Sequence, residues 1–366
     1  MNALIVGVDA GGTGTRAVLA TMDGLADRAV NGSVPGAVPG AVPGAVPGAV
    51  PGAVPGAVIG AVPGAVIGAV PGAVIGRGRA GPGNPLRHPN APAEFEQAIR
   101  AALDGHDPTR VVAVGLGVAG ITGLRHADYT NALARLGITG SFSAYADAVT
   151  AFAAGTSADC GVVLIAGTGA IAARVRDQQV TQTADGLGWL LGDRGSGVWL
   201  GLAAVRRIAR TWPRTPFAAA VTRHADARTV DELLAWGNRP SPDQYAALAP
   251  IVCDHAGQGD ADALSLVDEA ATELLRTLDE LGQPAGPVVL AGGLLTGRTA
   301  VTAALTRALT ERGVPHSVAG DPALSAALLT LPPPPPPSSP TTPRPVDPPP
   351  HPHPPPSPSL PVDHGV

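Results

Sequence analysis

Lysine is absent from this chain of 366 residues, so all 24 of its basic residues are arginines. A P-loop nucleotide site needs a lysine on the phosphates, and a protein kinase needs a lysine on one strand, so both classes are excluded. Only two cysteines are present, Cys160 and Cys253, which are too few and too far apart for a zinc or iron–sulfur ligand set from one chain. Any nucleotide chemistry in this protein must use another architecture.

Excess charge and long apolar runs are also missing. The net charge is −5, and the arginines are scattered singly, which disfavours nucleic acid or an acidic membrane as a partner. No apolar run free of glycine and proline approaches 18 residues, so no membrane span is expected. The N-terminus lacks a basic region and reaches Asp9 too early for a signal peptide. With two thiols expected to stay reduced, these features favour a cytoplasmic protein.

Proline and glycine are plentiful but concentrated in two segments. Residues 35–74 repeat a four-residue unit, mostly PGAV, ten times, and residues 332–366 form a tail with 18 prolines. Neither composition suits a packed core, and the tail is expected to be disordered. The rest of the chain is long enough for two lobes of about 100 to 200 residues each.

The remaining sequence predicts an α/β protein with an internal duplication. A strand pair with a glycine turn, then a helix and a strand, occurs twice, which predicts two units of the type βββαβα. Strands are expected at 3–8, 15–21, 111–120, 141–146, 161–167, 170–175 and 287–293, with a third strand of the first unit starting near 74. Helices are expected at 91–104, 125–136, 148–154, 196–212, 299–312 and 322–331, with more between 217 and 282 and a loop at 184–195.

Chemistry is first indicated after the first strand, where Asp9 precedes the glycine turn Gly11-Gly12-Thr13-Gly14-Thr15. A carboxylate at a strand end can hold hydrated Mg²⁺, while the backbone N–H groups and two hydroxyls of such a turn can surround phosphate oxygens. A tight turn that needs glycine only for its conformation is the alternative.

A second glycine turn, Gly167-Thr168-Gly169, occupies the corresponding place in the second unit. Two such turns, one from each unit, could hold one triphosphate from both sides. Gly292 and Gly293 follow a later strand, where glycines let a base and ribose lie against the backbone. The set therefore indicates a nucleotide site, although a structural turn remains the alternative at Gly292-Gly293.

These motifs resemble, in their order, the BadF/BadG/BcrA/BcrD ATPase family, and most of all its N-acetylglucosamine kinase branch. They are DAGGTGTR, GPGNP, AYADA, LIAGTG, DGLGWLLGDRGSG and VLAGG. The resemblance implies two ribonuclease H-like lobes of the actin/hexokinase type around an ATP cleft. It implies ATP and Mg²⁺ as cofactors, an amino sugar as the small-molecule partner and N-acetylglucosamine 6-phosphate as the product, and it leaves a homodimer open. The domains would be 1–120, with the repeat as an insertion, and 121–331, whose last helix could pack on the first lobe.

The resemblance also implies roles for single residues. Asp9 would organise Mg²⁺ through water, and Asp147 would be the catalytic base. Asn84, Gly186, Leu187, Gly188 and Asp193 would contact the sugar together with Asp147. The ATP contacts would be Gly11, Gly12, Thr13, Thr15, Gly167, Thr168, Gly169, Gly292 and Gly293.

The role of Asp147 also follows from chemistry, because phosphoryl transfer to an alcohol needs one carboxylate at the attacking hydroxyl. Asp147 lies between a predicted strand and a predicted helix, so it could instead cap that helix. Asp193 has the same alternative, as a cap for the helix starting near Ser196. Leu187 and Arg194 stand where many family members have Trp and Glu, which leaves the choice of sugar open.

Three other functions stay open at this point. An ATPase activator of an acyl-CoA dehydratase shares the fold, but it needs cluster-binding cysteines after the second turn, and residues 170–178 contain none. An elastic or interaction protein would be built on the repeat, and a non-catalytic sugar sensor would bind without turnover. We interpret the repeat as a tolerated insertion at a hairpin connection, because closure entropy grows only logarithmically with loop length. Deleting 35–74 should then leave sugar affinity nearly intact.

Overall fold

The computed structural model describes residues 3–22, 73–239, 241–283 and 285–331. The Asp23-Gly24 turn, nearly all of the repeat and the proline-rich tail lie outside these residues. Two five-stranded sheets form the framework, and we describe each sheet with the helices that contact it.

The first sheet has the strand order β3-β2-β1-β4-β5. Strands β1, β2 and β3 are antiparallel neighbours, and β4 and β5 extend the sheet in parallel from β1. The predicted start of the third strand near residue 74 is confirmed. The bounds are β1 (Leu4–Ala10), β2 (Thr15–Thr21), β3 (Val74–Ala80), β4 (Val111–Val118) and β5 (Ser141–Ala146).

The second sheet repeats this topology, with the order β10-β9-β6-β7-β8. Here β6, β7 and β8 are antiparallel, and β9 and β10 follow in parallel, so the duplication predicted from the sequence is confirmed. The bounds are β6 (Cys160–Ala166), β7 (Ala170–Arg176), β8 (Gln179–Asp185), β9 (Val288–Ala291) and β10 (His316–Val318). Strands β8 and β10 were not predicted from the sequence, and the start of a loop was expected at 184, within β8. β8 is mostly exposed and polar, and β10 has three residues, so neither shows an apolar period.

The helices follow their predicted ranges within a few residues. Between β3 and β6 lie α1 (Ala91–Ala102), α2 (His126–Arg135), α3 (Asp147–Ala153) and two short 3₁₀ turns, Pro108–Arg110 and Ile121–Gly123. The segment between β8 and β9 contains α4 (Gly197–Thr211), α5 (Pro216–His224), α6 (Val230–Gly237), α7 (Pro242–Ala246), α8 (Ala249–Gly257) and α9 (Ala261–Glu280). The last helices are α10 (Gly293–Thr296), α11 (Ala300–Glu311) and α12 (Pro322–Leu329).

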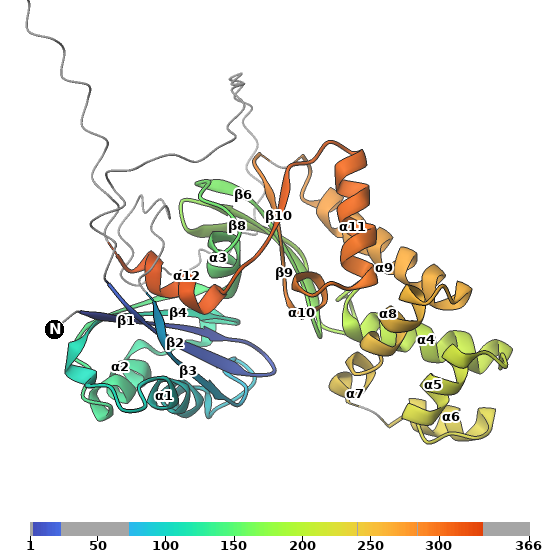
Figure 1. The fold of residues 1–366 in the computed structure, drawn as a ribbon, viewed down its shortest axis with the longest axis horizontal. Coiled ribbons are helices and arrows are strands. Elements are labelled where there is room, and N and C mark those ends of the chain that lie inside the picture. Colours follow the sequence, from blue (N-terminus) through green and yellow to red (C-terminus); the bar gives the residue numbers. More distant parts are fainter. Residues whose placement is uncertain (1–2, 23–72, 240, 284, 332–366) are drawn as a thin grey trace, which may run out of the picture. The chain divides into compact units, whose positions relative to one another are not determined.

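Helix α12 packs on the first sheet although it is the last helix of the described residues (Figure 1). The contact is close because β1 and β4 present glycines to it. A Cβ atom at Gly7 would collide with the carbonyl oxygen of Ala323, and one at Gly115 with that of Ala326. The Arg77 guanidinium of β3 also forms a 2.8 Å ion pair with Asp321, which caps the helix. Residues at the two ends of the described chain thus stabilise each other.

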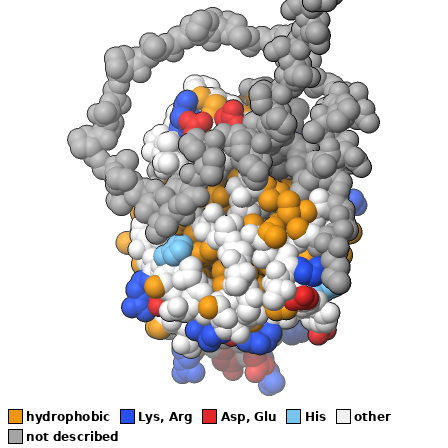
Figure 2. All heavy atoms as spheres, turned by 90° about the vertical axis from the view of Figure 1, so that its left-hand side faces the viewer, with side chains coloured by type: hydrophobic (Ala, Val, Ile, Leu, Met, Phe, Trp, Pro, Cys, Tyr) orange, Lys and Arg blue, Asp and Glu red, His pale blue; other side chains and the backbone are white. Residues whose placement is uncertain are grey.

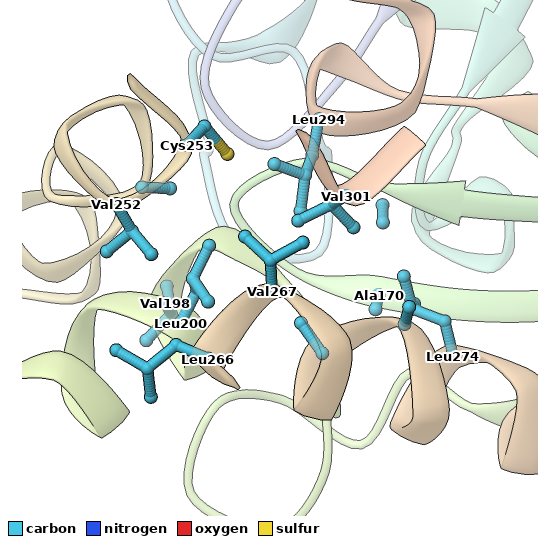
Figure 3. Packing of buried hydrophobic residues seen from close by; sticks show 14 of the residues in the cluster. Ala170, Val198, Leu200, Val252, Cys253, Leu266, Val267, Leu274, Leu294 and Val301 are labelled. Atoms are coloured by element: carbon cyan, nitrogen blue, oxygen red, sulfur yellow. The ribbon is translucent and has the colours of Figure 1, made fainter. Parts of the chain in front are cut away.

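The core beside the second sheet is built mainly from aliphatic side chains of α4, α8, α9, α10 and α11. Figure 3 shows Val267 near its centre, with Leu200 and Val252 to the left and Leu294 and Val301 above it. Cys253 lies at the edge of this core and, like Cys160, carries a free thiol. This packing fixes the N-termini of α10 and α11 relative to the second sheet.

The repeat enters between β2 and β3, which are paired antiparallel with Ala20 opposite Val74. The Thr21 N–H also donates to the Ala73 carbonyl at 3.2 Å. The last repeat unit therefore supplies the start of β3, and a deletion that tests the insertion hypothesis must stop before Ala73. The cut at 74 expected from the sequence would remove a paired strand residue.

Tyr129→Phe is expected to leave the free energy of unfolding unchanged or to raise it by about 1 kcal/mol. Tyr129 packs beside the first sheet against Phe95, with ring centroids 5.1 Å apart, and its buried hydroxyl has no hydrogen-bond partner among the described residues. Burial of this group raises its pKa to about 12. Removing an unpaired buried hydroxyl relieves a desolvation cost, which urea unfolding would measure. A loss above about 1 kcal/mol would show that the hydroxyl has a bonding role.

The surface agrees with the charge pattern of the sequence. Basic and acidic side chains lie among one another along the lower edge of the face shown in Figure 2. Within the described ranges, none of the helices combines the length and the apolar character needed to cross a membrane.

Candidate active site

The first glycine turn joins β1 to β2 and is closed by a 2.9 Å hydrogen bond from the Gly11 N–H to the Gly14 carbonyl. Gly12 and Thr13 are exposed at its tip, and a Cβ atom at Gly12 would meet nothing within 4 Å. The turn is therefore open to a ligand on this side. Thr15 differs, because its buried hydroxyl donates to the Gly81 carbonyl at 2.8 Å.

The predicted sugar residue Asn84 belongs to a loop that is bonded to this turn. The Gly83 N–H donates to the Gly11 carbonyl at 3.0 Å. A Cβ atom at Gly83 would lie 2.5 Å from the Thr15 hydroxyl and 2.7 Å from the Ala10 Cβ, so only glycine allows this approach. The Asn84 side chain accepts the Leu86 N–H at 2.9 Å, which closes the loop.

The second turn, Gly167 to Gly169, joins β6 to β7 in the same way, with a 2.9 Å bond from the Gly167 N–H to the Gly169 carbonyl. The first N–H groups of α4 donate to it, from Gly197 to the Gly167 carbonyl at 2.7 Å and from Val198 to the Thr168 carbonyl at 3.3 Å. The turn is thereby fixed to the helix that follows the 186–195 loop.

Asp193 connects this loop to the second turn. Its carboxylate accepts the backbone N–H groups of Ala170 and Gly188, and a Cβ atom at Gly169 would lie 2.8 Å from its Oδ2. Burial raises the pKa of Asp193, and the charge of Arg87 acts to lower it. The cap of α4 is Ser196, whose hydroxyl accepts the Trp199 N–H at 3.2 Å, so the alternative role of Asp193 as the helix cap is wrong.

The remaining residues of the loop differ in exposure. Gly186 and Gly188 have φ angles of +73° and +83°, which glycine adopts readily. Leu187 is 65% exposed and therefore free to meet a ligand. Trp189 is partly buried and packs against Tyr245, with centroids 6.4 Å apart.

Asp9 and Asp147 form a pair of interacting carboxylates. Asp9 is the next-to-last residue of β1, and Asp147 is the first residue of α3, directly after β5. Burial raises the pKa of Asp9 to about 6, with a further contribution from the charge of Asp147 and an opposing one from Arg16. Burial also raises the pKa of Asp147, whose Oδ1 accepts the Ala148 N–H at 2.9 Å. The α3 cap is Ala146, so Asp147 is not the cap.

Asp9→Asn is expected to raise the free energy of unfolding by up to about 3 kcal/mol at pH 7.5. The folded pKa of about 6 exceeds the ordinary value of 3.8. Between these values the folded state binds more protons than the unfolded state, so wild-type stability falls as pH rises through this window. Asparagine does not ionise, and its advantage should therefore shrink towards zero at pH 4. Urea unfolding at pH 4 and 7.5 measures this, and an equal gain at both would contradict it.

A cavity of about 360 Å³ borders the second turn. It is lined by Gly167, Thr168 and Gly293 together with residues of α8 and the start of α11. A Cβ atom at Gly167 would be 3.6 Å from the Gly293 nitrogen, so two predicted ATP elements are adjacent. Gly292 has a φ of +85°, and a Cβ there would collide with the Ala166 carbonyl oxygen.

Several polar groups of this cavity were not found from the sequence, namely Asp254, Arg298 and Thr299. Thr299 caps α11, and its hydroxyl accepts the Thr302 N–H at 3.0 Å. The Gly292-Gly293 motif ends five residues before Arg298, so the sequence offered a signal that Arg298 and Thr299 lie near the nucleotide site. Asp254 has no local motif, because only tertiary packing brings α8 to this place.

The residues fit the groups that the resemblance implies. Gly12 leaves open space at the first turn and Gly293 does so beside the second, and the cavity has room for part of a nucleotide. Among the described residues, no three His, Cys, Asp or Glu side chains gather as a metal site. Asp9 and Asp147 nevertheless suit Mg²⁺, which keeps several waters and binds through one or two carboxylates together with substrate phosphates.

Comparisons with known proteins find similar sequences and a similar fold. The N-acetyl-D-glucosamine kinase of Dictyostelium discoideum is 27% identical over 214 residues, which cover 54% of this chain and 67% of the relative. The glucosamine kinase of Vibrio cholerae is 26% identical over 118 residues, or 31% of this chain, and only 40% of its own length is matched. A solved structure from Chromobacterium violaceum, titled as a candidate N-acetylglucosamine kinase, has a TM-score of 0.62 at 23% identity and covers 90% of this chain and 99% of its own.

The fold is therefore that of the actin/hexokinase type, as the sequence predicted. The model of the BadF/BadG/BcrA/BcrD ATPase family matches residues 6–328, which is nearly all of the chain that the structure describes. On this match the chain belongs to the BadF/BadG/BcrA/BcrD ATPase family.

Proposed function

We propose that this protein is an ATP-dependent kinase of amino sugars and that it transfers the γ-phosphoryl group to the 6-hydroxyl of N-acetylglucosamine. One observation supports this most. In both halves of the duplicated fold, a predicted sugar-binding residue lies on a loop bonded to a glycine turn or to the residue next to it. The Gly83 N–H beside Asn84 donates to the Gly11 carbonyl, and Asp193 accepts the N–H of Ala170, which follows the second turn. Sugar and phosphate groups would thus be held by connected elements.

Different residues would bind the phosphates, the adenosine and the sugar. Gly11 to Thr13 and Gly167 to Gly169 would bind the phosphates through backbone N–H groups, with Thr15 contributing to the turn through its bond to Gly81. Gly292 and Gly293 would lie against the adenosine at the cavity. Asn84, Gly186, Leu187, Gly188 and Asp193 would orient the sugar.

Asp147 would accept the proton of the attacking hydroxyl. A base works best when its pKa approaches the operating pH, and burial raises the pKa of Asp147 in that direction. Asp9 would hold a hydrated Mg²⁺, which when bound neutralises charge on the phosphates. The two sheets, with α12 added to the first, would form the two domains of the enzyme.

An ADP-release assay over a panel of sugars tests this function. We expect N-acetylglucosamine, or glucosamine as the nearest relative, to stimulate ADP release far above the rate without sugar. Proton-coupled phosphorus NMR of the product would identify the phosphorylated hydroxyl. Sugar-independent ATP hydrolysis would instead support the ATPase activator, and binding without turnover would support the sensor.

A further inference from the structure

Asp185 is a buried carboxylate for which the proposed mechanism has no use. It ends β8, and its side chain is only 1% exposed. Its Oδ1 accepts the Asp193 N–H at 2.7 Å, and its Oδ2 accepts the Arg194 N–H at 2.9 Å. The carboxylate thus accepts two successive backbone N–H groups and closes the 186–195 loop at its far end.

The backbone around this contact is shaped for it. Asp185 and Asp193 have φ angles of +61° and +54°, in the left-handed region that Asp and Asn tolerate better than most residues. A Cβ atom at Gly192 would collide with Oδ1 of Asp185, so a glycine at 192 is needed for the carboxylate to reach Asp193. The left-handed conformations of Asp185 and Asp193 and the close approach at Gly192 therefore all accompany the contacts made by the Asp185 side chain.

Arg194 extends this contact to α9. Its Nε lies 3.2 Å from Oδ2 of Asp185, and its terminal nitrogen donates to Glu280 at 2.6 Å. Charge-assisted hydrogen bonds of this kind are among the stronger ones, and here one partner is buried. The positive charge of Arg194, a residue that departs from the family pattern, is thus balanced by the carboxylates of Asp185 and Glu280. Glu280 lies on the last turn of α9, a helix of 20 residues.

We propose that Asp185 is a positioning residue that sets the Asp193 carboxylate for the sugar hydroxyls, with Arg194 anchoring the pair to α9. This inference rests on the proposed function, because it needs Asp193 to contact the sugar. Asp193 can reach the second glycine turn and the sugar together only while its backbone is held at its left-handed φ. Asp185 would therefore affect sugar binding without touching the sugar.

The first test is Asp185→Asn, which tolerates the same φ and keeps the shape but has one acceptor oxygen instead of two. We expect the KM for N-acetylglucosamine to rise about 10- to 100-fold, as for a misplaced positioning group, and the KM for ATP to stay within about twofold. Hydrogen exchange of the Asp193 and Arg194 amides, read from peptides over 186–195, should accelerate at least about tenfold. Arg194→Gln keeps both backbone acceptors and should show smaller changes in each readout.

A second test uses charge. Arg194→Glu places a like charge beside Asp185 and Glu280 and should raise the KM for the sugar more than Arg194→Gln does. Asp185→Gly, which accepts the φ of +61°, removes both backbone acceptors, so Arg194→Glu should add less to the KM for the sugar in this background than in the wild type. Such non-additivity is expected for residues in contact or in one hydrogen-bond network. Arg207→Gln is the matched control, since it breaks a 2.5 Å ion pair with Glu269 elsewhere on α9 and should leave the KM for the sugar unchanged.

The outcomes separate this inference from the proposed function. Faster exchange in Asp185→Asn with an unchanged KM for the sugar would overturn the positioning role and leave Asp185 a purely structural group. Unchanged hydrogen exchange of the Asp193 and Arg194 amides in Asp185→Asn would show that Asp185 does not stabilise the 186–195 loop. Without sugar-dependent turnover in the wild type, the proposed function fails and the effect on sugar binding fails with it, while exchange alone decides whether Asp185 holds the loop.

Discussion

Asp147→Asn is expected to lower kcat for sugar phosphorylation by about 10²- to 10⁴-fold, the usual contribution of a general base. The side chain keeps its shape and can still accept the Ala148 N–H, but it cannot take the proton of the attacking hydroxyl. The KM values for ATP and sugar should change little, because the turns and loops that bind them are not altered. Steady-state kinetics with both substrates measures this split.

A matched control for the lost carboxylate is Asp128→Asn on α2, where Asp128 forms an ion pair with the exposed Arg125. This variant should retain kcat within about twofold, since surface ion pairs contribute about 0 to 1 kcal/mol. An Asp147→Asn enzyme with nearly wild-type kcat would show that another group accepts the proton, or that none needs to.

Gly7→Ala is expected to lower the free energy of unfolding by about 1–3 kcal/mol or more, the usual cost of overpacking a core. The new methyl group would collide with the carbonyl oxygen of Ala323 and come within 2.8 Å of the Ala327 nitrogen, both on α12. Backbone atoms cannot move aside as side chains do, so α12 must shift away from β1. Because β1 carries Asp9 near its end, sugar phosphorylation should fall as well.

Urea unfolding followed by circular dichroism measures the loss in Gly7→Ala. Gly257→Ala is the control: it lies in α8 with nothing within 4 Å of a new Cβ, and alanine in a helix gains about 0.5–1 kcal/mol over glycine. Equal stability of Gly7→Ala and wild type would mean that α12 does not pack on β1 as described.

Apolar periodicity and glycine turns in the sequence predicted most of this fold. Strands such as β1 and β4 are short, buried apolar runs that end in glycines, and they fell within two residues of their predicted ends. β8 was not predicted from the sequence because an exposed strand with alternating Gln and Thr has no apolar face to detect. The placement of α12 on the first sheet depends on glycines at positions 7 and 115, and their purpose appears only with the helix beside them.

The candidate site was predictable where local motifs define it and not where packing defines it. Asp9, Thr168 and Asn84 belong to short patterns, and the structure places each of them at or beside a glycine turn. Asp254 is brought to the site by α8, which lacks such a pattern. Asp185 begins the motif DGLGWLLGDRGSG, but its role could not be predicted because its contacts with Asp193 and Arg194 are visible only in three dimensions. Arg194 looked like an unexplained charge in the sequence, and only the three-dimensional contacts reveal its partners.

The central claim is that a sugar hydroxyl, and not water, accepts the γ-phosphoryl group of ATP. Incubating the protein with γ-labelled ATP, Mg²⁺ and N-acetylglucosamine, and separating labelled sugar phosphate from labelled inorganic phosphate, tests this claim directly. The account predicts that nearly all released label is found in a sugar phosphate and that Asp147→Asn forms little of it. Label found only in inorganic phosphate, at a rate that the sugar does not change, would contradict the account.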